Sequence, residues 1–223
     1  MTPRDDRGVT GLSVSSGEPG RPSATSHAPV DGSEGAADVL ADRVLATRPR
    51  LGPVRLVCVD GPAGSGKSTL AARLADRLAA GGTQAVVVHL DDLYAGWSGL
   101  EGDLWPRLSA QVLEPLRRQL PGRYQRYDWV AGEFADWVDV PVPQVLVLEG
   151  CGAARREAAA DAALTVWVEA PAGLRLERGL ARDGADMRTH WLTWMETEAA
   201  HFARERTRER ADARIDAYGK MAG

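Results

Sequence analysis

The chain has 223 residues, of which 44% are hydrophobic and 26% are charged, and its formal net charge is −4 at pH 7. This length suits one α/β domain with a sizeable core. The acidic balance argues against nucleic acid as a partner, because nucleic-acid-binding proteins usually carry a basic patch. The N-terminus lacks the apolar stretch of a signal peptide, and no apolar run reaches the roughly 18 residues of a membrane span, so we expect a cytoplasmic protein with no membrane contact.

Nearly all of the basic residues are arginine. Lys67 and Lys220 are the two lysines among the 27 basic residues, which leaves 25 arginines. A position that keeps lysine against this preference is a candidate for a role that arginine does not fill.

The first 35 residues are rich in Gly, Ser, Pro and Thr and show almost no apolar spacing. Such a composition buries too little surface to offset the entropy of ordering, so residues 1–35 are predicted to form a disordered tail before a single domain over residues 36–223. The spacing of apolar residues over 36–48 predicts a short amphipathic helix that ends at Pro49.

Strands and helices then alternate along the chain. Apolar runs predict strands over residues 54–59, 85–90, 145–148 and 164–168, and a weak last strand over 213–215. Helical periodicity covers residues 67–80, 103–120, 171–182 and 186–210. This alternation implies right-handed crossovers and a parallel sheet flanked by helices, a three-layer α/β/α domain whose ligands bind at the carboxyl ends of the strands. Cys58 and Cys151 lie in or beside apolar runs and are expected to be buried free thiols.

A glycine-rich segment after the first strand carries the most specific motif in the chain. Positions 61–68 fit the pattern G-x-x-x-x-G-K-[ST], and they stand between a buried strand and a helix as the motif requires. In this pattern backbone N–H groups converge on phosphate oxygens, Lys67 adds a positive charge, and Ser68 offers a hydroxyl to Mg²⁺. The predicted nucleotide site comprises Gly61, Pro62, Ala63, Gly64, Ser65, Gly66, Lys67, Ser68 and Thr69.

Carboxylates follow two of the predicted strands. Asp91 and Asp92 come at the end of the second strand, and Glu149 ends the third. Because the carboxyl ends of parallel strands share one edge of the sheet, these side chains are expected beside the phosphate loop, with one carboxylate available as a base and another for Mg²⁺ or its water. The alternative is that the aspartates cap the next segment and that Glu149 is a solvated strand end.

The sequence resembles a known group of enzymes. Besides the loop, the order of four segments is that of the uridine kinase and phosphoribulokinase group of P-loop kinases: Leu90-Asp91-Asp92-Leu93-Tyr94, Tyr127-Asp128-Trp129, Leu148-Glu149-Gly150 and residues 175–183. The resemblance covers about residues 54–216. It implies that ATP is the phosphoryl donor, that Asp91 accepts the proton of the substrate hydroxyl, and that Glu149 lies near Mg²⁺.

The same resemblance implies arginines that reach the transferring phosphoryl group from a helix and a lid. Arg175, Arg178 and Arg182 fall at i, i+3 and i+7 on one helix face. Arg182, supported by Arg178, is the strongest candidate, because Asp183-Gly184 follows it and breaks the helix where a lid over residues 183–190 would begin. In a chain so rich in arginine, a solvated helix face is the alternative.

Aromatic and acidic residues near the predicted site are candidates to bind the acceptor, the molecule whose hydroxyl receives the phosphoryl group. Tyr94, Trp97, Tyr127 and Trp129 follow elements that should face it, and flat rings would suit a base, a sugar face or an aromatic acid, although half-buried packing also accounts for such rings. Asp128, with Asp91 and Asp92, is expected to contact the acceptor. Two departures from related enzymes bear on its identity. The histidine that follows Tyr-Asp-Phe in uridine kinases is absent here, and the Leu-Asp-Thr-Gly segment of cytidylate kinases is replaced by residues 90–94.

The predicted last helix carries an apolar stripe at helical spacing, formed by Trp191, Trp194, Met195, Ala199 and Phe202. The stripe is expected to pack on the core, with a homodimer face as the alternative. His89, inside the second strand, is expected to be packed rather than catalytic.

Together the motifs favour an ATP-dependent kinase of a small-molecule hydroxyl, such as that of a nucleoside like uridine. A nucleotide-dependent switch or ATPase without an acceptor, and a nucleoside monophosphate kinase, remain as alternatives.

Overall fold

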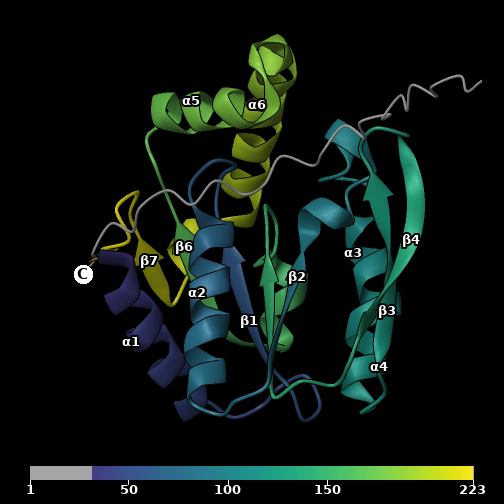
Figure 1. The fold of residues 1–223 in the computed structure, drawn as a ribbon, viewed down its shortest axis with the longest axis vertical. Helices are drawn as coiled ribbons and strands as arrows, with labels where there is room; N and C mark the ends of the chain where they lie inside the picture. Colours follow the sequence, from purple (N-terminus) through teal and green to yellow (C-terminus); the bar gives the residue numbers. More distant parts are fainter. Residues whose placement is uncertain (1–31, 223) are drawn as a thin grey trace, which may run out of the picture.

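The computed structural model describes residues 32–222. Its centre is a sheet with the strand order β2-β5-β1-β6-β7-β8, in which the first five strands are parallel and β8 pairs antiparallel to β7 (Figure 1). The strands are β1 Arg55–Asp60, β2 Ala85–His89, β5 Val145–Glu149, β6 Ala162–Val168, β7 Ala213–Ile215 and β8 Met221–Ala222. The prediction of a parallel sheet flanked by helices is confirmed.

Helices cover both faces of this sheet. They are α1 Gly32–Ala46, α2 Lys67–Ala80, α3 Leu104–Leu108, α4 Glu114–Arg117, α5 Ala172–Asp183, α6 Arg188–Glu205 and α7 Thr207–Arg210. Helices α1 and α2 pack on one face of the sheet, and α3, α4 and part of α6 pack on the other. In Figure 1, α5 and α6 lie beyond the tips of the strand arrows, at the edge of the sheet where parallel strands place their ligands.

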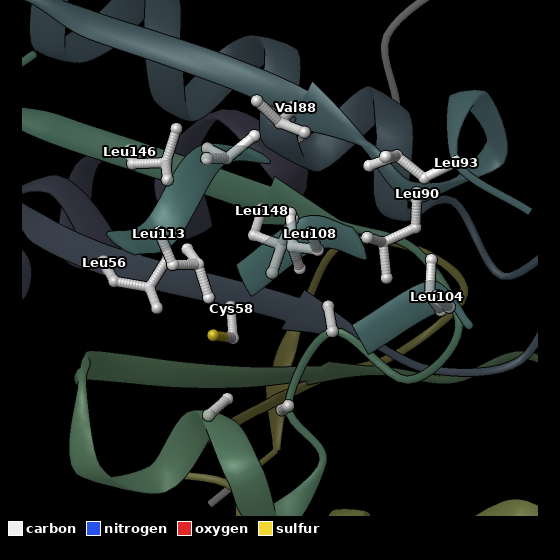
Figure 2. Packing of buried hydrophobic residues seen from close by; sticks show 14 of the residues in the cluster. Leu56, Cys58, Val88, Leu90, Leu93, Leu104, Leu108, Leu113, Leu146 and Leu148 are labelled. Carbon is white, nitrogen blue, oxygen red and sulfur yellow. The ribbon is translucent and has the colours of Figure 1, made fainter. Parts of the chain in front are cut away.

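The two hydrophobic cores follow from the alternation of side chains along each strand. On β1, Leu56 and Cys58 face the α3 and α4 side, whereas Val57 and Val59 face α1 and α2. Figure 2 shows Cys58 among leucines of the first of these cores. Both Cys58 and Cys151 are buried and free, as expected.

A β-hairpin that the sequence analysis did not anticipate projects beside the main sheet. It consists of β3 Gly122–Asp128 and β4 Glu133–Val140, which pair antiparallel (Figure 1). Charged and polar residues are interspersed with Tyr, Phe, Trp and Val in both strands, so that no continuous apolar run marks them. The enrichment in aromatic residues and Gly132 in the turn were the available signals.

Several boundaries differ from those expected. Helix α1 begins at Gly32, so residues 32–35 belong to a helix and not to a disordered tail; the rest of the predicted tail lies outside the described residues. The helix expected over 103–120 is α3, a π-helical segment over Ser109–Leu113 and α4. The helix expected over 186–210 breaks between α6 and α7 at Arg206, whose φ is 54°.

Of the predicted apolar stripe on α6, Trp191 and Trp194 are buried, Met195 and Phe202 are partly buried, and Ala199 is exposed, so the stripe packs on the core only in part. In the described part of the chain, no helix has the length and apolarity needed to span a membrane.

Candidate active site

The phosphate loop runs from the end of β1 to the start of α2, at the carboxyl edge of the sheet. Its glycines are required by close packing as well as by positive φ. A Cβ on Gly61 would overlap the carbonyl oxygen of Val168 in β6, and one on Gly64 would overlap that of Arg175 in α5. The helix that follows begins at Lys67, so its unpaired N–H groups point toward the loop, as anion binding requires.

Lys67 is almost fully buried within this loop, and its Nζ donates to the carbonyl oxygen of Pro62 at 3.0 Å. Burial opposes its charge, but negative groups nearby, among them Glu149 and Asp91, raise the pKa of Lys67 above its ordinary value. The hydroxyl of Ser65 is buried, and in the described part of the chain it has no hydrogen-bond partner. An unpaired hydroxyl beside a buried ammonium suits a bound phosphate, so the loop fits the nucleotide that the motif implies.

Glu149 ends β5, the central neighbour of both β1 and β2. Its Oε1 accepts a hydrogen bond from the Ser68 hydroxyl at 3.0 Å and pairs with His89 Nδ1 at 2.5 Å. Burial alone would raise the pKa of Glu149, but the bonds from His89 and Ser68 and the charge of Lys67 lower it below its ordinary value. The hydroxyl and the carboxylate that the sequence assigned to Mg²⁺ therefore lie together, and their oxygens are of the type that Mg²⁺ prefers.

His89 was expected to be a packed residue, and this is wrong. Its side chain is 45% exposed, and its ring contacts the carboxylate of Glu149, which raises the pKa of His89 through that hydrogen bond. Since β2 is an edge strand, its last residue has solvent on one side.

Asp91 lies in the 3-10 turn Leu90–Asp92 that follows β2. Its residue is solvent-exposed, and no hydrogen-bond donor in the described part of the chain contacts its carboxylate. Although the residue as a whole is exposed, the protein packed around its carboxylate and the charge of Glu149 raise the pKa of Asp91, while Lys67 and Arg182 oppose the rise. Such a carboxylate is free to accept a hydrogen bond from a ligand. Asp92, by contrast, accepts one from the hydroxyl of Tyr124 at 2.9 Å and so holds the hairpin.

The three arginines of α5 have different contacts. Arg175 is largely buried and pairs with Glu198 at 2.6 Å, and Arg178 donates to the carbonyl oxygen of Gly64 at 3.2 Å. Arg182 is 65% exposed and pairs with Asp183 at 2.7 Å, and its charge is near enough to lower the pKa of Asp91. Arg178 therefore contacts the phosphate loop, and Arg182 lies within electrostatic range of Asp91. The predicted lid over residues 183–190 contains Gly184, the 3-10 turn Ala185–Met187 and the first turn of α6.

The aromatic residues divide into core and site. Tyr94 was expected to face the acceptor, but it is 1% exposed, its hydroxyl donates to the carbonyl oxygen of Cys151 at 2.9 Å, and its ring lies 5.1 Å from that of Trp194. The turn after β2 directs Tyr94 into the core. Trp129 stays at the site: it is 43% exposed, and its Nε1 donates to the backbone oxygen of Asp91 at 3.1 Å.

A hollow of about 310 Å³ lies between the hairpin and Asp92. Its walls are Asp92, Arg126, Tyr127, Asp128, Trp129, Ala135 and Asp136. One carboxylate oxygen of Asp128 accepts hydrogen bonds from the backbone N–H groups of Val130 and Ala131, which lowers the pKa of Asp128. Asp128 thus holds the hairpin turn in addition to lining the hollow.

Sequence reasoning missed two buried carboxylates that support the loop. Asp60, fully buried at the end of β1, accepts hydrogen bonds from the backbone N–H groups of Gly61, Gly152 and Ala154, so it ties the phosphate loop to the segment after β5. Glu198 on α6 is 1% exposed. Its signal was a glutamate at the spacing of an apolar stripe, seven residues after Trp191 and four after Trp194.

No protein-family model and no curated protein matches this chain. Among solved structures, a possible uridine kinase from Bacillus stearothermophilus superposes with a TM-score of 0.62 at 20% identity, and the match covers 82% of this chain and 98% of that one. The chain has the fold of a P-loop kinase. D-glycerate 3-kinase from Cryptococcus neoformans shares this P-loop kinase fold, with a TM-score of 0.51 at 16% identity over 89% of this chain and 99% of that one.

Proposed function

We propose that the protein is a kinase that transfers the γ-phosphoryl group of ATP to a hydroxyl of a small molecule. The observation that supports this most strongly is the carboxylate of Asp91, which no donor among residues 32–222 contacts, near a complete phosphate loop and the Ser68–Glu149 pair. A protein that binds a nucleotide only to change conformation needs no free base at this position. The proteins named above with the same fold are a possible uridine kinase and a D-glycerate kinase, which agrees with the proposal.

Each residue has a defined task under this proposal. The loop N–H groups and Lys67 hold the phosphate chain, and Ser68 with Glu149 would hold Mg²⁺, which when bound supplies charge neutralisation. Asp91 accepts the proton of the acceptor hydroxyl, and its raised pKa makes it the stronger base of the two site carboxylates. Arg178 and Arg182 stabilise negative charge from the side of α5.

The acceptor would occupy the hollow lined by Tyr127, Trp129 and Asp92, where Trp129 also contacts the backbone oxygen of Asp91. The histidine expected in a uridine kinase is absent from this segment. We therefore treat nucleosides, sugars and hydroxy acids as equally good candidates for the acceptor.

The test is a search for acceptor-stimulated ADP release. Purified protein is incubated with Mg·ATP and each member of a panel of nucleosides, nucleoside monophosphates, sugars and hydroxy acids, and the products are identified by mass spectrometry. We expect one class to stimulate ADP release and to gain one phosphoryl group. Lys67→Ala should reduce that turnover by roughly 10²- to 10³-fold, as expected when a charge donor is removed from a preorganised site.

Two results would contradict the proposal. Near-normal transfer by the Lys67→Ala protein would remove the loop from the mechanism. Nucleotide hydrolysis stimulated by a protein and by no member of the panel would favour a switch. Phosphorylation of a nucleoside monophosphate alone would leave the kinase but change its acceptor.

A further inference from the structure

Glu198 binds the phosphate loop from outside the active site. Its Oε2 accepts hydrogen bonds from the backbone N–H of Ala63 at 2.8 Å and from Trp194 Nε1 at 3.0 Å, and its Oε1 accepts one from Arg175 at 2.6 Å. Arg175 in turn donates to the carbonyl oxygen of Ala63 at 3.3 Å. Both polar groups of Ala63 are therefore held by a buried ion pair that joins α5 to α6.

This contact reaches Lys67 through one peptide unit. A trans peptide is planar, and its C=O and N–H point in opposite directions. In the unit between Pro62 and Ala63, the N–H points to Glu198 and the C=O accepts from Lys67 Nζ at 3.0 Å. Because the plane is rigid, fixing the N–H on Glu198 also fixes the oxygen that holds the ammonium.

We propose that Glu198 is a positioning residue for the phosphate-binding lysine: it orients the peptide between Pro62 and Ala63 and thereby sets the place of Lys67. The inference rests on the proposed nucleotide-binding function. It adds that the helix after the predicted lid region contributes to phosphate binding although none of its residues belongs to the motif. Glu198 also pairs with Arg175 of α5, the helix that carries Arg178. The same glutamate therefore helps to hold both the lysine and the arginine-bearing helix of the site.

Glu198→Gln is the informative substitution. Glutamine keeps the size of the side chain, but one of its two head atoms becomes an NH₂ group. Donors approach both oxygens of Glu198, so in either orientation the NH₂ group would face another donor, the N–H of Ala63 or the guanidinium of Arg175. Glu196→Gln, at an exposed position of the same helix, is the matched control.

The experiment is a double-mutant cycle on Mg·ADP affinity, measured by calorimetry for the wild type, E198Q, K67A and E198Q/K67A. We expect E198Q to weaken binding by roughly tenfold, the scale seen when a contact that orients a ligating group is removed. In the K67A background the further loss should be less than about twofold, because the two residues act on the same phosphate contact. E196Q should bind as the wild type does.

Equal losses from E198Q with and without Lys67 would overturn the inference, as would wild-type affinity in E198Q. Loss of a buried charge partner can prevent folding. Circular dichroism is therefore recorded first, and if E198Q does not fold, the cycle is run with R175Q/E198Q, which leaves no unpaired buried charge. Failure of the wild type to bind Mg·ADP would instead refute the proposed function itself.

Discussion

Asp91 and Glu149 stand at adjacent strand ends and are held in opposite ways. Glu149 accepts from Ser68 and His89, and these bonds favour its charged form. Asp91 receives no bond from the described residues, and its surroundings disfavour its charge. A carboxylate that is fixed and ionised suits a cation, whereas one that is free and has a raised pKa suits proton transfer.

Replacing Asp91 separates these two roles. Asp91→Asn should lower the rate of phosphoryl transfer to the identified acceptor by roughly 10²- to 10⁴-fold, the usual contribution of a positioned base. Mg·ADP affinity, measured by calorimetry, should stay close to that of the wild type. Asp103→Asn, at an exposed position, is the control. Weakened Mg·ADP binding with an unchanged rate of transfer would show that Asp91 is a metal contact.

At the scale of elements, α5 and α6 meet at a glycine. A Cβ on Gly179 would overlap the ring of Trp191, which is buried and donates to Asp183 at 2.9 Å. Gly179→Ala should therefore lower the free energy of unfolding by about 1–2 kcal/mol, because overpacking outweighs the better helix propensity of alanine. Urea denaturation measures the change.

Gly173, in the first turn of the same helix, provides the matched comparison. A Cβ there meets nothing within 4 Å, so Gly173→Ala should leave stability unchanged or raise it by up to about 1 kcal/mol. If both substitutions changed stability in the same direction, the packing of α5 on α6 would not be the cause.

A second contact between elements depends on pH. Glu101, in the loop before α3, pairs with Arg204 at 2.6 Å and His201 at 2.9 Å on α6. Burial opposes its charge, but these hydrogen bonds lower the pKa of Glu101 below its ordinary value. A depressed pKa contributes stability that is present above the unfolded value, about 4.3, and is lost as the pH falls through the folded value.

Glu101→Gln should accordingly cost up to about 1 kcal/mol at pH 7, since the pair is partly exposed and screened. The difference between mutant and wild type should shrink as the pH is lowered from 5 to 3. Denaturation curves at each pH measure it. A difference that stayed constant with pH would assign the loss to packing instead of charge.

At the scale of the whole molecule, a ligand that binds only the folded state must stabilise it. At a Mg·ADP concentration of about 100 times Kd the gain is about 2.7 kcal/mol, or roughly 5–11 °C in Tm for a domain of this size. Scanning calorimetry measures the shift. Lys67→Ala should reduce it markedly, and an unchanged shift in that variant would place the nucleotide elsewhere.

The sheet, its flanking helices and the phosphate loop could be predicted because their signals are local. An apolar run, a fixed spacing of leucines or a specific motif is decided by neighbouring residues, and α2 and β7 have the bounds expected from the sequence. The β3–β4 hairpin was missed because polar residues interrupt the apolar ones in both strands, which leaves no continuous apolar run to mark a strand.

The support of the site was harder to predict because it depends on contacts between distant segments. Glu198 holds Ala63 across 135 positions of the chain, and Asp60 holds Gly152 and Ala154 across more than 90. Tyr94 was misassigned although it is only three residues from Asp91. The 3-10 turn Leu90–Asp92 changes the direction of the chain, so the ring of Tyr94 enters the core and does not face the acceptor. Sequence spacing alone does not fix such directions.

The scarcity of lysine has a practical consequence for chemical labelling. Apart from the N-terminal amine, an acylating reagent finds two primary amines, Lys220, which is exposed, and Lys67, which is almost fully buried beneath the carbonyl oxygen of Pro62. Acylation of Lys67 requires the loop to open, whereas acylation of Lys220 does not. The ratio of the two labelled peptides therefore measures how often the loop opens, with Lys220 as an internal reference for reagent reactivity.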